Sequence, residues 1–162
     1  MDILEAPVPL HVDPRDAASA EAGSMGAKVV SINVPGEVGF RRLVSRTVAA
    51  VCRMACPHSA YDIFRQELVS AVGEAFNNAA LHAYALTRGN VCLTLSFDLS
   101  RIVVELVETG EPFDPAAVPE FAGDEPQESG MGLFIIRRFV DELLYTAGPP
   151  NRLRMVKRLP QP

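Results

Sequence analysis

The chain lacks an apolar run of the roughly 18 residues that a membrane-spanning helix needs. Its first five residues also lack the basic start and apolar stretch of a secretory signal. Hydrophobic residues still make up 48% of the 162 residues, and the mean hydropathy is +0.13. These values are typical of one compact domain with a substantial core. We therefore expect a cytoplasmic protein with no membrane contact.

Basic residues are in deficit. Lys and Arg number 15 against 20 Asp and Glu, which gives a formal net charge of −5. An acidic balance argues against non-specific binding to nucleic acid, which needs a basic face. We expect no direct contact with nucleic acid.

Cysteines are few: Cys52, Cys56 and Cys92. Cys52 and Cys56 stand four residues apart, which places them on one face of a helix. A metal site needs more ligands than these two, and only His58 lies nearby in the sequence. Buried structural thiols are the favoured interpretation, and a metal site is the alternative.

Residues 1–26 contain Pro7, Pro9 and Pro14 and no aromatic residue, so they predict a flexible tail before an ordered domain at 27–160. Gly and Pro punctuate residues 109–130, a long loop of the kind that often forms a lid. Periodicity predicts strands at 28–34, 91–99, 102–107, 142–146 and 152–159, and helices at 37–55, 61–84 and 131–143. This order predicts an α+β two-layer sandwich with the helices on one face of a mixed sheet.

A polar stripe crosses the middle of the second predicted helix. Glu74, Asn78 and His82 recur every fourth residue in an otherwise apolar segment. Asn is a poor helix former, so Asn77 and Asn78 in tandem need a reason. A carboxylate one turn from an amide oxygen places a proton acceptor beside a ligand suited to Mg²⁺. The alternative is an exposed polar face on an ordinary amphipathic helix.

Two further motifs follow. Glu108 and Gly110 stand at the end of an apolar strand, where the carboxylate can accept from a base's amino group while the backbone comes close. Gly130 and Gly132 open the third predicted helix, where free N–H groups and the helix dipole favour an anion. Taken singly, these motifs are also compatible with a Gly-Pro turn and with a flexible hinge.

In this order and at this spacing, the three motifs resemble the N, G1 and G2 boxes of the GHKL (Bergerat) ATP-binding fold. The closer resemblance is to bacterial anti-sigma-factor serine/threonine kinases, and it covers about residues 28–159. It rests on Glu-Ala-Phe-Asn-Asn-Ala-Ala-Leu-His-Ala at 74–83, Gly-Glu-Pro-Phe-Asp-Pro at 110–115, and Gly-Met-Gly-Leu-Phe-Ile-Ile-Arg-Arg-Phe-Val-Asp-Glu at 130–142. The resemblance implies a mixed, mostly antiparallel sheet.

The resemblance also implies roles for single residues. Glu74 would act as general base or orient the attacking hydroxyl. Asn78 would hold Mg²⁺ that bridges the phosphates of ATP. Glu108 would take the place of the family's adenine-reading aspartate, and Gly110 would let the base lie against the backbone.

The remaining residues of the implied ATP site come from all three motifs. Gly130 and Gly132 would cradle the phosphates. His82 would line the site or hold the motif helix rather than transfer a proton. Phe113, Met131 and Leu133 complete the implied set; for Met131 and Leu133 a position in the core is the favoured alternative.

The implied function is an ATP-dependent protein serine/threonine kinase and anti-sigma factor in a partner-switching system. Its partners would be a STAS-type anti-anti-sigma protein, which accepts the phosphate, and a sigma factor. Homodimerisation is implied by the family alone. A histidine-kinase-type ATPase is a weaker alternative, because no helix with a phospho-accepting histidine precedes the domain.

Two features favour a different class of function, a non-catalytic binding module. Glu108 is one methylene longer than the family's aspartate, and a misplacement near 1 Å can cost about a hundredfold in activity. Residues 102–136 contain no Lys or Arg but eight acidic residues, so Mg²⁺ and helix N–H groups would have to neutralise the phosphates. Arg88 follows the motif helix, and Arg137 and Arg138 follow one turn into the third predicted helix. A contribution to phosphate binding is the alternative for each, and exposed ion pairing is the favoured role.

Overall fold

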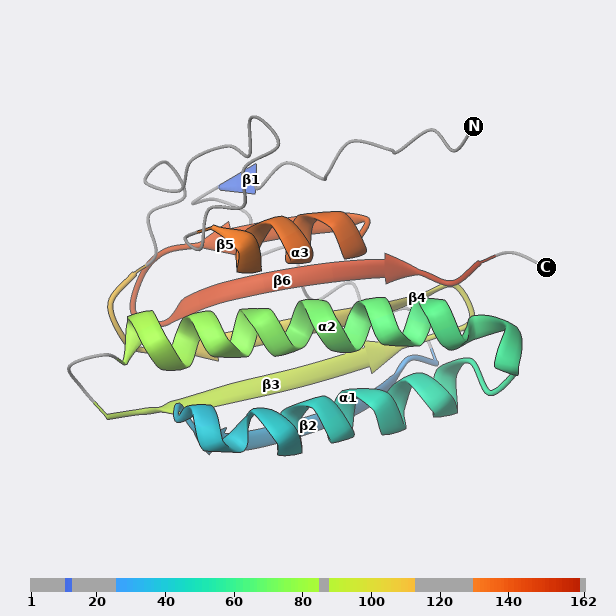
Figure 1. Ribbon diagram of the computed structural model, residues 1–162, viewed down its shortest axis with the longest axis horizontal. Coiled ribbons are helices and arrows are strands. Elements are labelled where there is room, and N and C mark those ends of the chain that lie inside the picture. The colour runs from blue at the N-terminus through green and yellow to red at the C-terminus, as the bar shows by residue number, and fades with distance from the viewer. Residues whose placement is uncertain (1–10, 13–25, 85–87, 113–129, 161–162) are drawn as a thin grey trace.

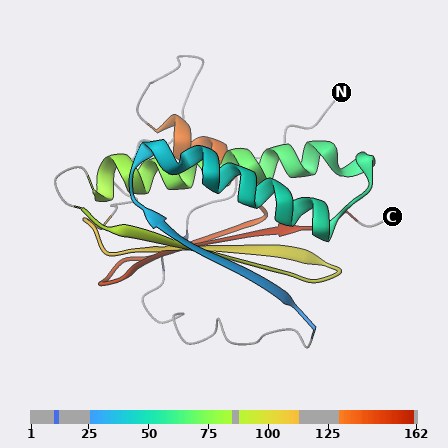
Figure 2. The ribbon, with the colours of Figure 1, turned by 90° about the horizontal axis from the view of Figure 1, so that it is seen from below.

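The computed structural model describes residues 11–12, 26–84, 88–112 and 130–160. These residues form one sheet whose strands follow the order β1-β5-β6-β4-β3-β2, with the helices packed on a single face (Figures 1 and 2). The elements are β1 His11–Val12, β2 Lys28–Pro35, α1 Arg41–Ala55, α2 Asp62–Asn78, β3 Asn90–Phe97, β4 Arg101–Glu108, α3 Met131–Phe139, β5 Glu142–Thr146 and β6 Asn151–Arg158. The predicted α+β sandwich with a mixed, mostly antiparallel sheet is confirmed.

The buried face of the sheet follows from strict alternation in its central hairpin. Val91, Leu93 and Leu95 of β3 are fully buried, as are Ile102 and Val104 of β4, while the residues between them are more exposed. Successive side chains of a strand point to opposite faces, so this pattern turns the buried apolar residues toward the helices and leaves Val103 and Val107 on the other face. All strand pairs are antiparallel except β1 with β5.

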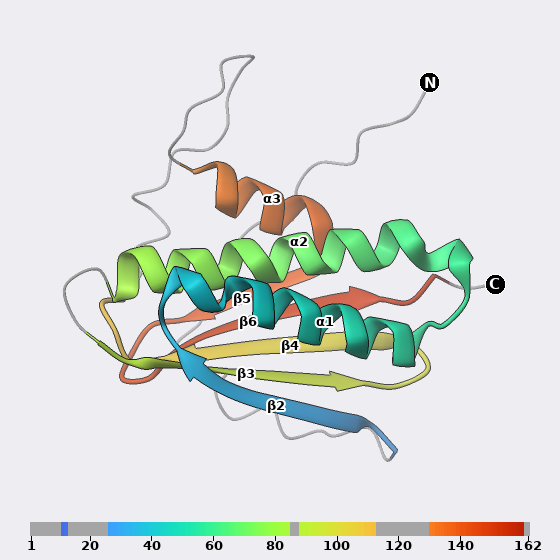
Figure 3. The same ribbon diagram turned by 60° about the horizontal axis from the view of Figure 1, so that its bottom comes forward.

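Helix α2 lies between α1 and α3 and packs against both (Figure 3). Its buried residues therefore extend around more than one face and include the small residues Ala71, Gly73 and Ala75. In α1, by contrast, burial is confined to one stripe that includes Val44, Val48 and Val51. This arrangement makes α2 the element on which the other two helices depend.

The segment predicted as a flexible tail contributes one short strand. His11 and Val12 pair in parallel with Leu144 and Tyr145, which extends the sheet beyond β5. A two-residue strand has no periodicity of its own, so the sequence pattern could not indicate it. The rest of residues 1–25 lies outside the described part of the chain.

The predicted helix at 61–84 is not regular. It begins with a 3₁₀ turn at Ser59–Tyr61 and ends as a π-helix at Ala79–Ala83. Tyr84 N–H donates to Ala79 O at 3.2 Å, a five-residue spacing. We attribute the wider turn to the packing of Tyr84, described next.

The side chain of Tyr84 joins the end of this helix to three strands. Its hydroxyl donates to Asn90 O at 2.8 Å and accepts from Thr109 N–H at 3.0 Å. Its ring occupies the space that a Cβ would need at Gly36 and at Gly89, where the closest ring atoms lie 2.2 and 2.3 Å from that position. The two glycines are thus required by the close approach of an aromatic ring.

The other helix bounds also need correction. The predicted helix at 37–55 begins with a 3₁₀ turn at Val38–Phe40 before α1. The predicted helix at 131–143 ends at Phe139, because Val140 is extended, with φ −118° and ψ 157°. Asp141 N–H then donates to Val156 O at 2.8 Å, which starts the pairing of β5 with β6.

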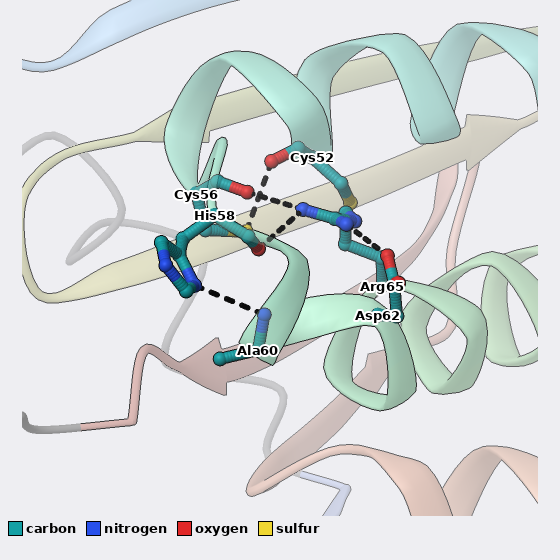
Figure 4. A network of polar contacts seen from close by, with 6 residues as sticks. All are labelled: Cys52, Cys56, His58, Ala60, Asp62 and Arg65. Carbon is teal, nitrogen blue, oxygen red and sulfur yellow. Dashed lines mark hydrogen bonds and ion pairs between the residues drawn. The ribbon is translucent and has the colours of Figure 1, made fainter.

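Arg65 closes the connection between α1 and α2 (Figure 4). Its guanidinium donates to Cys56 O at 2.6 Å and to His58 O at 3.0 Å, and it pairs with Asp62. His58 Nδ1 accepts from Ala60 N–H at 3.1 Å, so this histidine caps the 3₁₀ turn. Its ring thus has a structural role in the connection.

The two thiols of this connection are buried, as predicted. Cys56 Sγ donates to Cys52 O at 2.9 Å, and burial raises the pKa of Cys52 to about 12 and raises that of Cys56 as well. Cys92 is exposed. A thiol with a raised pKa is a poor metal ligand and nucleophile. Within the described ranges no helix is both long and apolar enough to cross a membrane.

Lys157 is a buried basic residue whose removal should destabilise the fold. Its ammonium donates to Glu67 Oε2 at 2.8 Å and to Phe139 O at 2.7 Å, and it lies 5.2 Å from the centroid of the Phe64 ring. We expect Lys157→Ala to lower the free energy of unfolding by about 1–3 kcal/mol, because a partly buried carboxylate and a carbonyl lose their partner.

Urea unfolding followed by circular dichroism measures this change. The matched control is Arg158→Ala, which removes an exposed ion pair with Glu142 from the next residue. Such pairs contribute about 0–1 kcal/mol. Equal effects of the two substitutions would contradict a structural role for Lys157.

Candidate nucleotide site

A cavity of about 200 Å³ opens between the end of α2, the start of α3 and the sheet. Such concave, mostly apolar sites with a few polar groups are typical of small-molecule binding. Its lining residues come from all three sequence motifs and from the sheet: Ala75, Asn78, Ala79, His82, Ala83, Leu106, Glu108, Glu111, Pro112, Gly130, Gly132, Leu133, Ile136, Tyr145 and Leu153.

The polar residues of α2 meet the start of α3 at Gly132. A Cβ on this glycine would lie 3.3 Å from Glu74 Oε2 and 3.3 Å from Asn78 Oδ1. A carboxylate oxygen of Glu74 and the amide oxygen of Asn78 thus both lie against the backbone of Gly132, which carries no side chain. Glu74 itself is not a lining residue of the cavity but stands at this junction.

Arg41 of α1 holds the other oxygen of Glu74. Its Nη2 donates to Glu74 Oε1 at 2.8 Å, and the two side chains are 43% and 24% exposed. The guanidinium passes over Gly73, where a Cβ would lie 3.3 Å from Nη2. Oε1 is thereby occupied while Oε2 faces Gly132. Sequence reasoning missed Arg41, because its distance along the chain from Glu74 leaves no motif to read.

The start of α3 has the geometry of an anion site. Gly130 adopts a left-handed conformation, with φ 98°, and precedes the first residue of the helix. Phe134 N–H donates to Gly130 O at 3.0 Å, which closes the first turn. The N–H groups before Phe134 have no carbonyl partner within the helix, and the helix dipole adds positive potential there. Gly132, which carries one of these N–H groups, lies next to Glu74 and Asn78.

Among the lining residues from the sheet, Glu108 of β4 is 7% exposed, and Asn151 on the neighbouring strand β6 is 2% exposed. Glu108 Oε1 accepts from Asn151 Nδ2 at 2.7 Å, and Oε2 accepts from Gly110 N–H. Asn151 is a second residue that sequence reasoning missed. In the sequence, Asn151 follows Gly148-Pro149-Pro150, and this pattern predicted only a turn.

Gly110 is required by its contact with the end of the motif helix. A Cβ at this position would lie 2.1 Å from Ala83 O, and Glu111 N–H donates to the same carbonyl at 3.0 Å. The chain can pass this close only without a side chain. The predicted contact of the Gly110 backbone with a base stays a prediction, since Gly110 is not among the lining residues.

The other predicted site residues fall into three groups. His82 is exposed and lines the cavity from the π-helical turn. Leu133 is buried and also lines the cavity, whereas the neighbouring Met131 is half-buried and does not line it. Phe113 lies outside the described residues. Arg137 and Arg138 stand in the last turn of α3, at the end opposite Gly130.

The oxygen atoms at Gly132 fit a magnesium ion held mainly by a nucleotide. The described residues contain no cluster of three or more His, Cys, Asp or Glu side chains that could hold a metal by themselves. Mg²⁺ commonly takes one or two protein oxygens and completes its shell with phosphates and waters. One amide oxygen, Asn78 Oδ1, beside an anion-binding helix start meets that requirement.

Comparison with known proteins agrees with this geometry. The family model for the histidine kinase-like ATPase domain matches residues 40–157. The serine-protein kinase RsbW of Staphylococcus epidermidis is 28% identical over 138 residues, which cover 79% of this chain and 85% of that protein.

Two further relatives are similar. The serine-protein kinase RsbW of Bacillus velezensis is 26% identical over 84% of this chain and 89% of its own length. An anti-sigma F factor of a Thermoanaerobacter species is 29% identical over 56% of this chain and 68% of its own length. The matched family segment contains every motif that builds the cavity. The chain therefore belongs to the histidine kinase-like ATPase domain family, within the GHKL group that includes anti-sigma kinases.

Proposed function

We propose that this protein is an ATP-dependent serine/threonine kinase that acts on another protein. Membership of the ATPase family implies ATP binding, and relatives named as serine-protein kinases support the transfer of phosphate to serine. The observation that carries the proposal is the convergence of Glu74, Asn78 and the N-terminal turn of α3 at Gly132. A binding module without chemistry has no need of a carboxylate at that point.

The proposed reaction is a direct phosphoryl transfer. The hydroxyl oxygen of the substrate attacks the γ-phosphorus of ATP, the bond to the β–γ bridging oxygen breaks, and ADP leaves. Glu74 Oε2 orients the hydroxyl and accepts its proton, while Arg41 keeps the carboxylate turned toward Gly132. Such reactions depend on positioning and charge neutralisation. Asn78 would hold Mg²⁺, which neutralises charge on the phosphates when bound.

The proposed protein substrate is a STAS-type anti-anti-sigma protein, and the second proposed partner is a sigma factor. Relatives named as the kinase RsbW and as an anti-sigma F factor support a partner-switching role. A homodimer is proposed on the family resemblance alone. An indirect regulator of this kind needs no basic face for DNA, in agreement with the net charge of −5.

A non-catalytic binding module is the second candidate. It is favoured by the state of Glu108, whose two carboxylate oxygens already accept hydrogen bonds from Asn151 and Gly110. In that case the fold would bind a sigma factor or an antagonist protein, with ATP as a weak ligand. A transfer assay separates the two candidates.

We expect Glu74→Gln to abolish transfer while ATP binding changes little. The amide keeps the size of the carboxylate but cannot accept the proton, and loss of a general base costs about 10²–10⁴-fold in rate. The measurement is transfer of labelled phosphate from ATP to STAS proteins encoded in the same genome, beside calorimetric ATP binding.

The control is Glu142→Gln, an exposed carboxylate far along the chain whose partner is Arg158. This variant should phosphorylate as wild type does. Absence of transfer to any STAS protein by a wild-type chain that binds ATP would favour the binding module. Undiminished transfer by Glu74→Gln would contradict the role of Glu74.

A methyl group at Gly132 should block the proposed phosphate and metal site. In Gly132→Ala the new Cβ would stand 3.3 Å from Glu74 Oε2 and Asn78 Oδ1, in the space that they share. We expect Mg²⁺-dependent ATP binding to weaken by about tenfold or more, which corresponds to about 1.4 kcal/mol. The fold should persist, because alanine favours a helix more than glycine does.

Gly39→Ala is the matched control, since a Cβ at Gly39 meets no atom within 4 Å. Calorimetry with MgATP compares the two variants, and thermal unfolding checks that both are folded. Unchanged affinity in Gly132→Ala would place the phosphates elsewhere.

A further inference from the structure

Three polar or charged residues are buried within the described part of the chain: Glu108, Asn151 and Lys157. Lys157 has structural partners on α2 and α3. Glu108 and Asn151 pair with each other instead, beside the cavity proposed to take ATP. Burying a polar pair lowers the stability of the fold unless each polar atom has a hydrogen-bond partner. The hydrogen bonds of this pair therefore indicate its role.

The amide of Asn151 is satisfied on both sides and its orientation is fixed. Nδ2 donates to Glu108 Oε1 at 2.7 Å and to Gly110 O at 3.0 Å. Oδ1 accepts from Gly148 N–H at 3.0 Å. A backbone N–H can only donate, and a carboxylate oxygen or carbonyl facing Nδ2 accepts, so the opposite amide orientation would set donor against donor and acceptor against acceptor.

The length of Glu108 suits this pairing. Its carboxylate spans from β4 to Asn151 at the start of β6, and its second oxygen accepts from Gly110 N–H. An aspartate in this position would end one methylene earlier, so its oxygens would not occupy the positions of the glutamate oxygens between Asn151 and Gly110. The residue that departs from the family pattern is thus matched by a second residue on the neighbouring strand.

We propose that Asn151 is a positioning residue that fixes the Glu108 carboxylate and thereby makes the nucleotide site select a base with an amino group over one with an oxo group. This inference rests on the proposed ATP binding. Both neighbours of the carboxylate are N–H donors and Glu108 lines the cavity, so the carboxylate keeps lone pairs that can accept a further hydrogen bond there. The amino group of adenine donates to such an acceptor, whereas the oxo group of hypoxanthine would face it as a second acceptor.

Loss of this hydrogen bond should lower the affinity for the nucleotide, because an unpaired acceptor in a buried site loses its hydration without compensation. Asn151 does not line the cavity and acts through Glu108. If it were merely structural, its substitution would weaken all nucleotides alike. If it positions Glu108, its substitution changes the ratio of affinities for two bases.

The test shortens Glu108 by one methylene, lengthens Asn151 by one methylene, and combines the two changes. Affinities for MgATP and MgITP are measured by calorimetry on wild type, Glu108→Asp, Asn151→Gln and the double variant, with Asn90→Gln as an exposed control. We expect each single variant to lower the ATP-over-ITP preference by about tenfold, the range for a hydrogen bond to a charged group. The double variant should recover most of that preference, and Asn90→Gln should retain all of it.

Equal weakening of both nucleotides in the single variants would overturn the inference and leave Asn151 a structural role. An unchanged preference in Glu108→Asp would overturn it too, and this variant stays informative if Asn151→Gln fails to fold. Wild-type protein that binds neither nucleotide would overturn the proposed function and this inference together.

Discussion

The contact between α2 and the start of α3 is the constraint on which the site depends. Gly132 lies against Glu74 and Asn78 so closely that a single methyl group would crowd both side chains. The contact exists because α2 is the middle helix and packs against α1 and α3 at once. From α1 comes Arg41, which holds the outer oxygen of Glu74, and from α3 come the free N–H groups of its first turn. Packing of the three helices therefore assembles a carboxylate, an amide oxygen and an anion-binding helix end at one point.

Charge explains why this assembly is needed. Residues 102–136 carry eight acidic residues and no Lys or Arg, and Arg137 and Arg138 stand at the far end of α3. In the proposed site, the helix end and a metal ion would neutralise the phosphates of ATP. Arg41 is engaged with Glu74, so in this conformation its charge serves the carboxylate. Glu108, in turn, has a neutral partner rather than a cation, because the amide of Asn151 donates to its carboxylate.

The sequence predicted most of the fold, because the signals involved were local and periodic. Alternation in β3 and β4 and the apolar stripe of α1 predicted elements that the structure confirms within a few residues. The errors arose where tertiary contacts override local pattern. The π-helical turn at Ala79–Ala83 follows from the packing of Tyr84 between Gly36 and Gly89, and α3 stops at Phe139 where pairing of β5 begins. Residues of all three motifs line one cavity, whose proposed role in ATP binding stays a prediction. No signal in the sequence indicated Arg41 or Asn151, since each contacts a residue more than 30 positions away.

The most direct test of this account is ATP binding measured by calorimetry with Mg²⁺ and with a chelator, on wild type, Asn78→Ala and Asn77→Ala. Asn77 neighbours Asn78 on α2 and does not line the cavity, so it is the matched control. The account predicts Mg²⁺-dependent binding by wild type and by Asn77→Ala, and loss of that dependence in Asn78→Ala. Wild-type binding that is indifferent to Mg²⁺, or an Asn78→Ala variant that binds MgATP as wild type does, would contradict the site assembled at Gly132.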